Sequence, residues 1–256
     1  MNWRAWLDAS PLAEVGLALM RDATGRDAPL EPLAPIRPAP LAARTVVAFW
    51  SLVGGVGCST TAALVAHRAA AAGVAPVLVD LDRWAPSLAL RAERTAATVT
   101  DALLRPGGET ALLSRWANVP FLPGSTDLHR TFDGPRVVEL LRALRRDRAV
   151  VIDLGSGADA LDPTVLEAID RLCVVVGSRV AQLQSAFCAA GLLADVGLPI
   201  SAVTVAAAEE DATRIAGRLP WPLIAAVPHD PYLAKDEFAS RAPTLRAIDK
   251  LIRALG

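Results

Sequence analysis

The chain has 256 residues, and its 26 basic residues nearly balance its 27 acidic ones. Only two of the basic residues are lysines, Lys235 and Lys250, and all the others are arginine. The first 234 residues therefore exclude any mechanism that needs a lysine nucleophile, a Schiff base or a lysine that holds a phosphate. The net charge of −1 argues against a general polyanion binder, so we do not expect nucleic acid as a partner.

The composition is that of a globular protein, with 53% hydrophobic and 21% charged residues. Charged residues interrupt the longest apolar stretches, which argues against a membrane-spanning helix. The N-terminus has no signal-peptide pattern. Cys58, Cys173 and Cys188 lack paired spacing, which indicates a reducing compartment and no zinc site. We therefore expect a cytoplasmic protein.

The first 42 residues differ in composition and hydrophobic pattern from the rest of the chain. Residues 1–27 predict a short helical extension, in which Trp3 and Trp6 share a face that could contact a partner or a membrane surface. Residues 28–42 contain five prolines and predict an extended linker. Residues 43–256 then form the predicted main domain.

From residue 44 onward, buried strands alternate with helices. Near-continuous runs of Val, Ile, Leu and Ala predict strands at 45–51, 76–80, 119–122, 149–153, 172–176, 201–206 and 223–227. Helical patterns lie between them at 59–72, 97–105, 135–146, 180–194, 210–218 and 243–255. This alternation predicts a doubly wound α/β domain, with a mainly parallel sheet and helices on both faces.

A glycine-rich segment follows the first predicted strand. Glycines let backbone N–H groups turn inward, and the following helix adds the positive end of its dipole, so the segment predicts a phosphate-binding loop. Ser59 stands where such loops place a Mg²⁺ ligand. The expected cofactor-binding residues are Gly54, Gly55, Val56, Gly57, Cys58, Ser59 and Thr60.

The loop resembles the deviant phosphate loop of the MinD/ParA ATPases, K-G-G-x-G-K-[ST]-T, which here starts at Val53 and ends at Thr60. The resemblance covers about residues 44–256 and implies the SIMIBI-type P-loop NTPase fold. Both lysines of the motif are replaced, by Val53 and Cys58. In the family the first lysine reaches the partner's nucleotide across a dimer, and the second neutralises the β- and γ-phosphates.

Two further segments carry the same resemblance. Residues 77–88 are similar to the family's second strand and switch I. This similarity implies that Asp80, at the strand end, is a metal-site residue, and that Asp82 orients the catalytic water. Residues 150–157 are similar to Walker B and switch II, which implies that Asp153 and Ser59 serve Mg²⁺. Residues 224–243 resemble the segment that flanks the base, whereas the Asn-Arg pair often used for adenine is replaced around residues 204–207.

Loss of the lysines, with the glycines and Ser-Thr retained, resembles the TadZ/CpaE branch, which localises type IV (Tad) pilus machinery, often at a cell pole. This resemblance implies a spatial organiser or scaffold with protein partners and with weak or absent ATP hydrolysis. A homodimer and peripheral membrane contact through the N-terminus fit the same expectation. Two alternatives stay open for the cofactor: the site binds ATP or ADP with Mg²⁺ weakly, or it binds no nucleotide.

Alternatives to a degenerate site remain. An active partitioning-type ATPase could use a substitute arginine, such as Arg83 or one from a partner. A structural partner protein that binds no nucleotide, or a biosynthetic enzyme on the same fold, are two others. Cys58 at a helix start could be a reactive thiol, although no neighbouring His or second Cys supports this. The arginine run around Arg142 to Arg148 predicts a solvated helix face more than a DNA contact.

Overall fold

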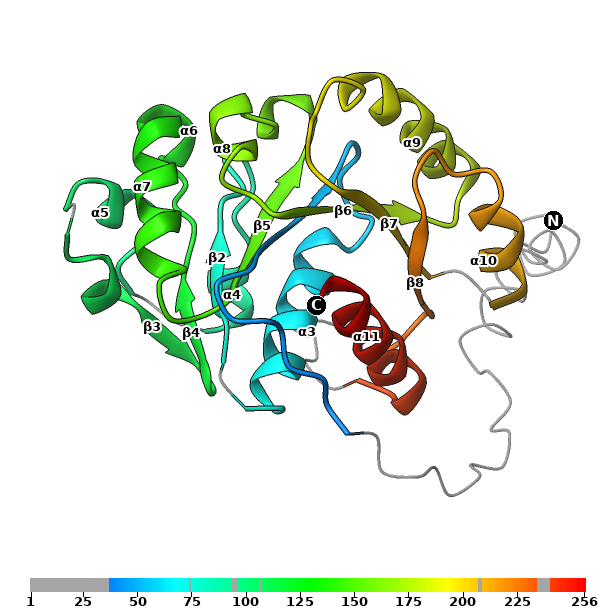
Figure 1. The fold of residues 1–256 in the computed structure, drawn as a ribbon, viewed down its shortest axis with the longest axis horizontal. Helices are drawn as coiled ribbons and strands as arrows, with labels where there is room; N and C mark the ends of the chain where they lie inside the picture. Colours follow the sequence, from blue (N-terminus) through cyan, green and yellow to red (C-terminus); the bar gives the residue numbers. More distant parts are fainter. Residues whose placement is uncertain (1–36, 74, 94–95, 106, 207–208, 234–239) are drawn as a thin grey trace, which may run out of the picture. The chain divides into compact units, whose positions relative to one another are not determined.

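The computed structural model describes residues 37–256, apart from residues 74, 94–95, 106, 207–208 and 234–239 and the side chains of residues 209–211 and 213. In this part of the chain the apolar strands form one sheet. The sheet has the strand order β3-β4-β2-β5-β1-β6-β7-β8 (Figure 1). All neighbouring strands pair in parallel except β3 and β4. The strands are β1 Val46–Ser51, β2 Val77–Asp80, β3 Ser114–Trp116, β4 Val119–Leu122, β5 Val150–Ser156, β6 Arg171–Gly177, β7 Ile200–Val205 and β8 Leu223–Val227.

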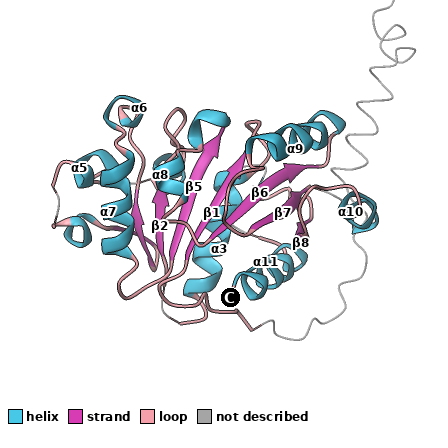
Figure 2. Ribbon diagram, turned by 45° about the horizontal axis from the view of Figure 1, so that its top comes forward, coloured by secondary structure: helices cyan, strands magenta, loops and turns pink. Residues whose placement is uncertain are grey.

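Each face of the sheet has its own hydrophobic core, because side chains alternate along a strand. Val47 and Phe49 of β1 lie in one core, whereas Val46, Ala48 and Trp50 lie in the other. Helices cover both cores (Figure 2). The first core takes α3 Cys58–Ala70, α4 Leu88–Arg91 and α11 Ala242–Leu255, and the second takes α5 Val99–Leu103, α6 Leu128–Thr131, α7 Gly134–Leu144, α8 Pro163–Leu166 and α9 Val180–Leu192. The predicted doubly wound α/β fold is confirmed.

Most predicted elements have a counterpart, and the differences are local. The predicted helix at 97–105 is shorter, because α5 starts at a capping box between Thr98 and Asp101 and ends after Leu103. The short elements β3, α4, α6, α8, η1 (Glu109–Leu112) and η2 (Ala158–Ala160) were not predicted. The last helix before β8 is α10 Glu209–Ala216, close to its predicted range.

The described part of the chain is one compact unit from Arg37 to Gly256. Ala39 and Leu41 are buried in the same core as α3, so this core extends a few residues before the predicted start at 43. The predicted helical extension with Trp3 and Trp6 lies outside the described residues, and the domain boundaries stay a prediction. Among the helices that the structure describes, none is long and apolar enough to span a bilayer.

Candidate functional site

The glycine-rich loop joins the end of β1 to the start of α3. Gly55 and Gly57 have φ angles of 75° and 95°, which side chains other than glycine rarely adopt. The carbonyl of Gly57 accepts hydrogen bonds from the Thr61 amide, at 2.9 Å, and from the Thr61 hydroxyl, at 2.8 Å. Val56 is buried in the core and also lines the space above the loop. The segment therefore has the tight turn into a helix N-terminus that an anion site needs.

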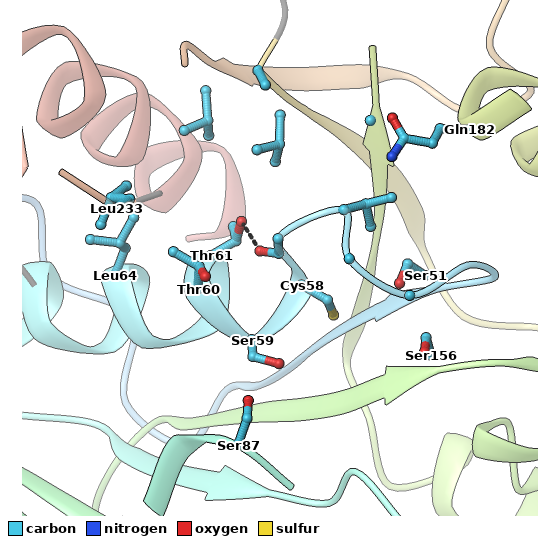
Figure 3. A pocket seen from close by; sticks show the side chains of 18 of the residues that line it. Ser51, Cys58, Ser59, Thr60, Thr61, Leu64, Ser87, Ser156, Gln182 and Leu233 are labelled. Carbon is cyan, nitrogen blue, oxygen red and sulfur yellow. Dashed lines mark hydrogen bonds between the residues drawn. The ribbon is translucent and has the colours of Figure 1, made fainter. Parts of the chain in front are cut away.

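A cavity of about 640 Å³ opens above this loop at the carboxyl ends of the central strands (Figure 3). This is where open α/β sheets bind their ligands, and the size suits a nucleotide. Its polar and glycine lining from the loop and α3 consists of Ser51, Gly54, Gly55, Gly57, Cys58, Ser59, Thr60 and Thr61. The end of β5 and the segments after β2 and β6 add further residues, namely Asp82, Ser87, Arg91, Gly155, Ser156, Ser178, Arg179 and Gln182.

Asp153 of β5 lies beneath the start of α3. Its Oδ1 accepts hydrogen bonds from the Gly155 amide, at 2.9 Å, and from the Cys58 thiol, at 3.5 Å. Its Oδ2 is buried and has no partner among the described residues. Burial raises the pKa of Asp153, and the neighbouring Ser59 hydroxyl opposes this rise. The structure thus brings the predicted Mg²⁺ residues Ser59 and Asp153 together.

This pair fits a magnesium ion. Mg²⁺ keeps several waters and uses one or two protein carboxylates together with substrate phosphates, so a dedicated protein cage is not required. Within the described residues no group of three or more His, Cys, Asp or Glu side chains could hold a metal. The unpartnered Asp153 Oδ2 and the Ser59 hydroxyl are therefore the protein groups that would hold the ion, directly or through water.

Asp80 ends β2 beside Asp153 in the sheet register. Its two oxygens accept the backbone amides of Asp82, at 3.1 Å, and Leu88, at 3.2 Å. Burial, and then the charge of Asp153, raise the pKa of Asp80 well above its usual value. Asp80 thus holds the loop from 81 to 88 in place, and its role as a metal-site residue stays a prediction.

Asp82 connects this loop to the segment after β5. Its Oδ1 accepts the amides of Trp84, at 3.0 Å, and Ala85, at 2.9 Å. Gly155, at φ 71°, lies so close that a Cβ there would stand 2.3 Å from the Asp82 carboxyl carbon. Asp82 also lines the cavity. Its catalytic role stays a prediction.

The two positions that carry lysine in the family motif have uncharged side chains that are already engaged. Cys58 is buried and donates to Asp153, and burial, followed by the Asp153 charge, raises the pKa of its thiol well above the usual value. The thiol therefore stays protonated, which argues against a reactive cysteine. Val53 packs against the hydrophobic core on the α3 side of the sheet.

Sequence reasoning missed several residues that line the cavity. Arg91, at the end of α4, donates from Nη1 to the Thr60 hydroxyl oxygen at 2.7 Å. Arg83 is the substitute cation considered from the sequence. Its guanidinium carbon instead lies 3.3 Å from the centre of the Phe132 ring, and its Nη2 lies 3.7 Å from Asp162 Oδ2. Arg91 belongs to no motif and lies 31 residues after Thr60, so no local signal could have identified it.

Part of the cavity lining is apolar. It includes Val205, Ala206, Val227 and Pro228, and Val205 lies beside Gly57 of the loop. Asp230, two residues after Pro228, is buried. Its carboxylate accepts hydrogen bonds from the Tyr232 amide, at 3.1 Å, from the Arg241 amide, at 2.7 Å, and from the Thr244 hydroxyl, at 2.8 Å. The segment that resembles the family's base-flanking motif is therefore anchored to the start of α11 through this carboxylate.

The basic run before β5 lies at the amino ends of the strands, away from the cavity. Arg145 pairs with Asp170 at 2.8 Å and donates to the Arg44 carbonyl at 2.9 Å. Arg44 in turn donates to the Arg146 carbonyl. Part of this run therefore holds the chain entering β1.

The comparisons with known proteins find similarity in structure. No protein-family model matches the chain, and a sequence search finds no matching curated protein. MinD of Pyrococcus horikoshii OT3, solved with Mg-ADP, matches with a TM-score of 0.71 and 19% identity over 82% of this chain and 95% of that one. A ParA family ATPase of Chlorobium tepidum TLS matches with a TM-score of 0.68 and 18% identity over 82% and 99%. Cobyrinic acid a,c-diamide synthase of Mycobacterium smegmatis, solved with ADP and magnesium, gives 0.65 and 20% over 82% and 93%.

Because the sequence identities are only 18–20%, the similarity establishes the fold and nothing more specific. The mainly parallel eight-stranded sheet with helices on both faces is the fold that the chain shares with those structures. The chain has the P-loop NTPase fold of the MinD and ParA ATPases.

Proposed function

We propose that this protein is a MinD/ParA-like spatial organiser of the TadZ/CpaE type, which binds ATP or ADP with Mg²⁺ weakly and hydrolyses ATP little. The nucleotide part of the proposal is supported by the cavity, the left-handed glycines and the Ser59–Asp153 pair with its unpartnered carboxylate oxygen. Two of the structures that share the fold were solved with ADP and magnesium.

The replacement of both motif lysines carries the proposal. Where the motif provides an ammonium group, Cys58 donates a hydrogen bond to Asp153 and Val53 packs against the core. Loss of one charge-assisted hydrogen bond to a phosphate costs about 1.5–3 kcal/mol, or roughly 10- to 150-fold in affinity. Hydrolysis loses more, because that charge also stabilises the transition state.

A protein with this site acts by docking partners. Following the resemblance to TadZ/CpaE, we propose that it localises type IV (Tad) pilus or similar secretion machinery at the membrane or the cell pole. A homodimer and peripheral contact through Trp3 and Trp6 are parts of the same proposal. A fluorescent fusion in the native cells should form a focus together with the assembly ATPase, and a uniformly diffuse signal would reject this role.

Two other functions share the fold. An active ATPase is favoured by one observation, the presence of Arg91 in the cavity. A biosynthetic role is favoured by the likeness to the diamide synthase, but the chain has no lysine in the loop where such enzymes use it. A steady-state phosphate-release assay separates the first from our proposal.

Restoring the lysines tests the degenerate site directly. The double variant Cys58→Lys/Val53→Lys should bind ATP about tenfold more tightly or better, and should release phosphate faster than the wild type. Cys188→Lys is the matched control, because Cys188 is exposed on α9 and does not line the cavity. If the wild type already turns over ATP steadily and the double variant does not exceed it, the degenerate-site proposal fails.

A further inference from the structure

Two arginines line the cavity in the described part of the chain, and they differ in setting. Arg179 is exposed at the start of α9, whereas Arg91 is half-buried. The Arg91 guanidinium donates to the Thr60 hydroxyl oxygen at 2.7 Å, and Thr60 belongs to the first turn of α3, directly after the phosphate loop. Arg91 therefore brings a positive charge to the helix N-terminus at which an anion would bind.

The position of Arg91 is fixed by the fold. Leu88, at the start of α4, is fully buried, and its amide donates to Asp80 Oδ2 at 3.2 Å. One turn later, the Arg91 amide donates to the Ser87 carbonyl at 3.3 Å. The side chain thus starts from a helix anchored to the end of β2 and reaches α3 across the cavity wall.

We propose that Arg91 holds the nucleotide's phosphates in place of the lysine missing at position 58. This inference rests on the proposed nucleotide site. An arginine offers five N–H donors in a planar fork, which suits phosphate oxygens. The Asp82 carboxylate lines the same cavity and Asp153 lies under Cys58 at the start of α3, so an anionic ligand needs a cation close by.

The alternative is that Arg91 only braces α4 against α3 through Thr60. A brace and a phosphate ligand make different predictions. Removal of a brace lowers the thermal stability of the nucleotide-free protein, whereas removal of a phosphate ligand lowers the affinity for polyphosphates and leaves that stability nearly unchanged.

The test compares Arg91→Met and Arg91→Lys with the wild type in titrations with ATP–Mg²⁺ and with inorganic pyrophosphate. We expect Arg91→Met to weaken both affinities by about tenfold or more, and Arg91→Lys to retain most of them. Arg253→Met is the control, because Arg253 is exposed on α11. Melting temperatures without nucleotide should agree among the four proteins.

Each outcome decides the matter. If the wild type binds ATP and Arg91→Met binds within about twofold of it, this inference is wrong and the proposed nucleotide site stands. If Arg91→Met and Arg91→Lys lose affinity and melting temperature together, Arg91 is a brace and the inference is again wrong. If the wild type binds neither ATP nor pyrophosphate, the proposed nucleotide site fails, and this inference fails with it.

Discussion

Three buried carboxylates meet below the phosphate loop, and their hydrogen bonds give them different roles. Asp80 accepts backbone amides with both oxygens, and Asp82 accepts two amides with one oxygen. Asp153 keeps one buried oxygen without a partner among the described residues. A buried carboxylate oxygen without a donor is costly unless a proton or a cation compensates it. Asp153 is therefore the carboxylate best suited to a bound magnesium ion.

The raised pKa of Asp153 predicts a pH-dependent stability. A carboxyl group whose pKa is raised by folding stabilises the folded state at low pH, and that contribution is lost as pH rises through the folded-state pKa. Asp153→Asn keeps the Oδ1 acceptor and removes the buried charge. In EDTA, its melting temperature should therefore rise above that of the wild type by an amount that grows from pH 5 to pH 8.

The control for this variant is Asp147→Asn, because Asp147 is exposed. Its melting temperature should follow that of the wild type at both pH values. An Asp153→Asn difference that shrinks towards pH 8 would contradict the account of Asp153.

Gly155 is required by the contact between the two switch-like segments. At φ 71° a side chain is strained, and a Cβ would overlap the Asp82 carboxyl group. Gly155→Ala should cost about 1–3 kcal/mol of unfolding free energy and should weaken ATP–Mg²⁺ binding, because Asp82 must move.

Gly191→Ala is the matched control for that change. Gly191 lies within α9, and a Cβ there meets nothing within 4 Å, so alanine should stabilise the protein by about 0.5–1 kcal/mol. Urea unfolding of both variants measures the difference. Equal effects of the two substitutions would show that the Asp82–Gly155 contact does not constrain the site.

At the scale of elements, an ion pair between two helices fixes the helix that begins at the phosphate loop. Arg68, near the end of α3, donates from Nε and Nη2 to the two oxygens of Asp249 in α11, both at 2.8 Å. The Asp249 side chain is 1% exposed, and that of Arg68 is 15% exposed. Bidentate geometry in a buried setting makes this pair sensitive to loss of one partner.

Asp249→Ala should therefore destabilise the protein by about 3–5 kcal/mol, because the largely buried Arg68 guanidinium loses its bidentate carboxylate partner. Arg136→Ala is the comparison, since its pair with Asp133 is 56% and 46% exposed and should be worth about 1 kcal/mol or less. Chemical denaturation provides both values. A loss below about 1 kcal/mol for Asp249→Ala would mean that the pair does not hold α3.

The elements differ in how far the sequence could predict them. The long strands and helices were predicted because each buries a continuous or periodic apolar surface. β3 has three residues and is stabilised by its pairing with β4. The turn that joins the two strands contains Ala117, whose φ is 50°. α4 depends on the Asp80 side chain that accepts the Leu88 amide. Such contacts join residues outside the local pattern, so the pattern could not reveal them.

The site shows the same division. The loop from Gly54 to Thr60 is local, and its glycines and hydroxyls form one motif that could be identified from the sequence. Arg91 and Gln182 line the cavity from other elements, and each depends on the sheet order for its place. The structure also shows that Arg83 faces Phe132 and Asp162, which its position after Asp82 could not indicate.

At the scale of the whole molecule, the fold does not choose the function. The same architecture occurs in MinD, in a ParA family ATPase and in a diamide synthase. In this chain the cavity lining includes Cys58, Asp82 and Arg91, and both lysines of the motif that the loop resembles are replaced, by Val53 and Cys58. Our account is that such a cavity retains nucleotide but turns it over poorly, as suits a positioning protein.

The most direct test is to titrate the full chain with ATP–Mg²⁺ in a calorimeter and to measure phosphate release from the same samples. We expect saturable binding at one nucleotide per chain, with phosphate release no faster than that of the Asp82→Asn variant. Steady turnover well above that variant, or no binding up to millimolar ATP, would contradict the account.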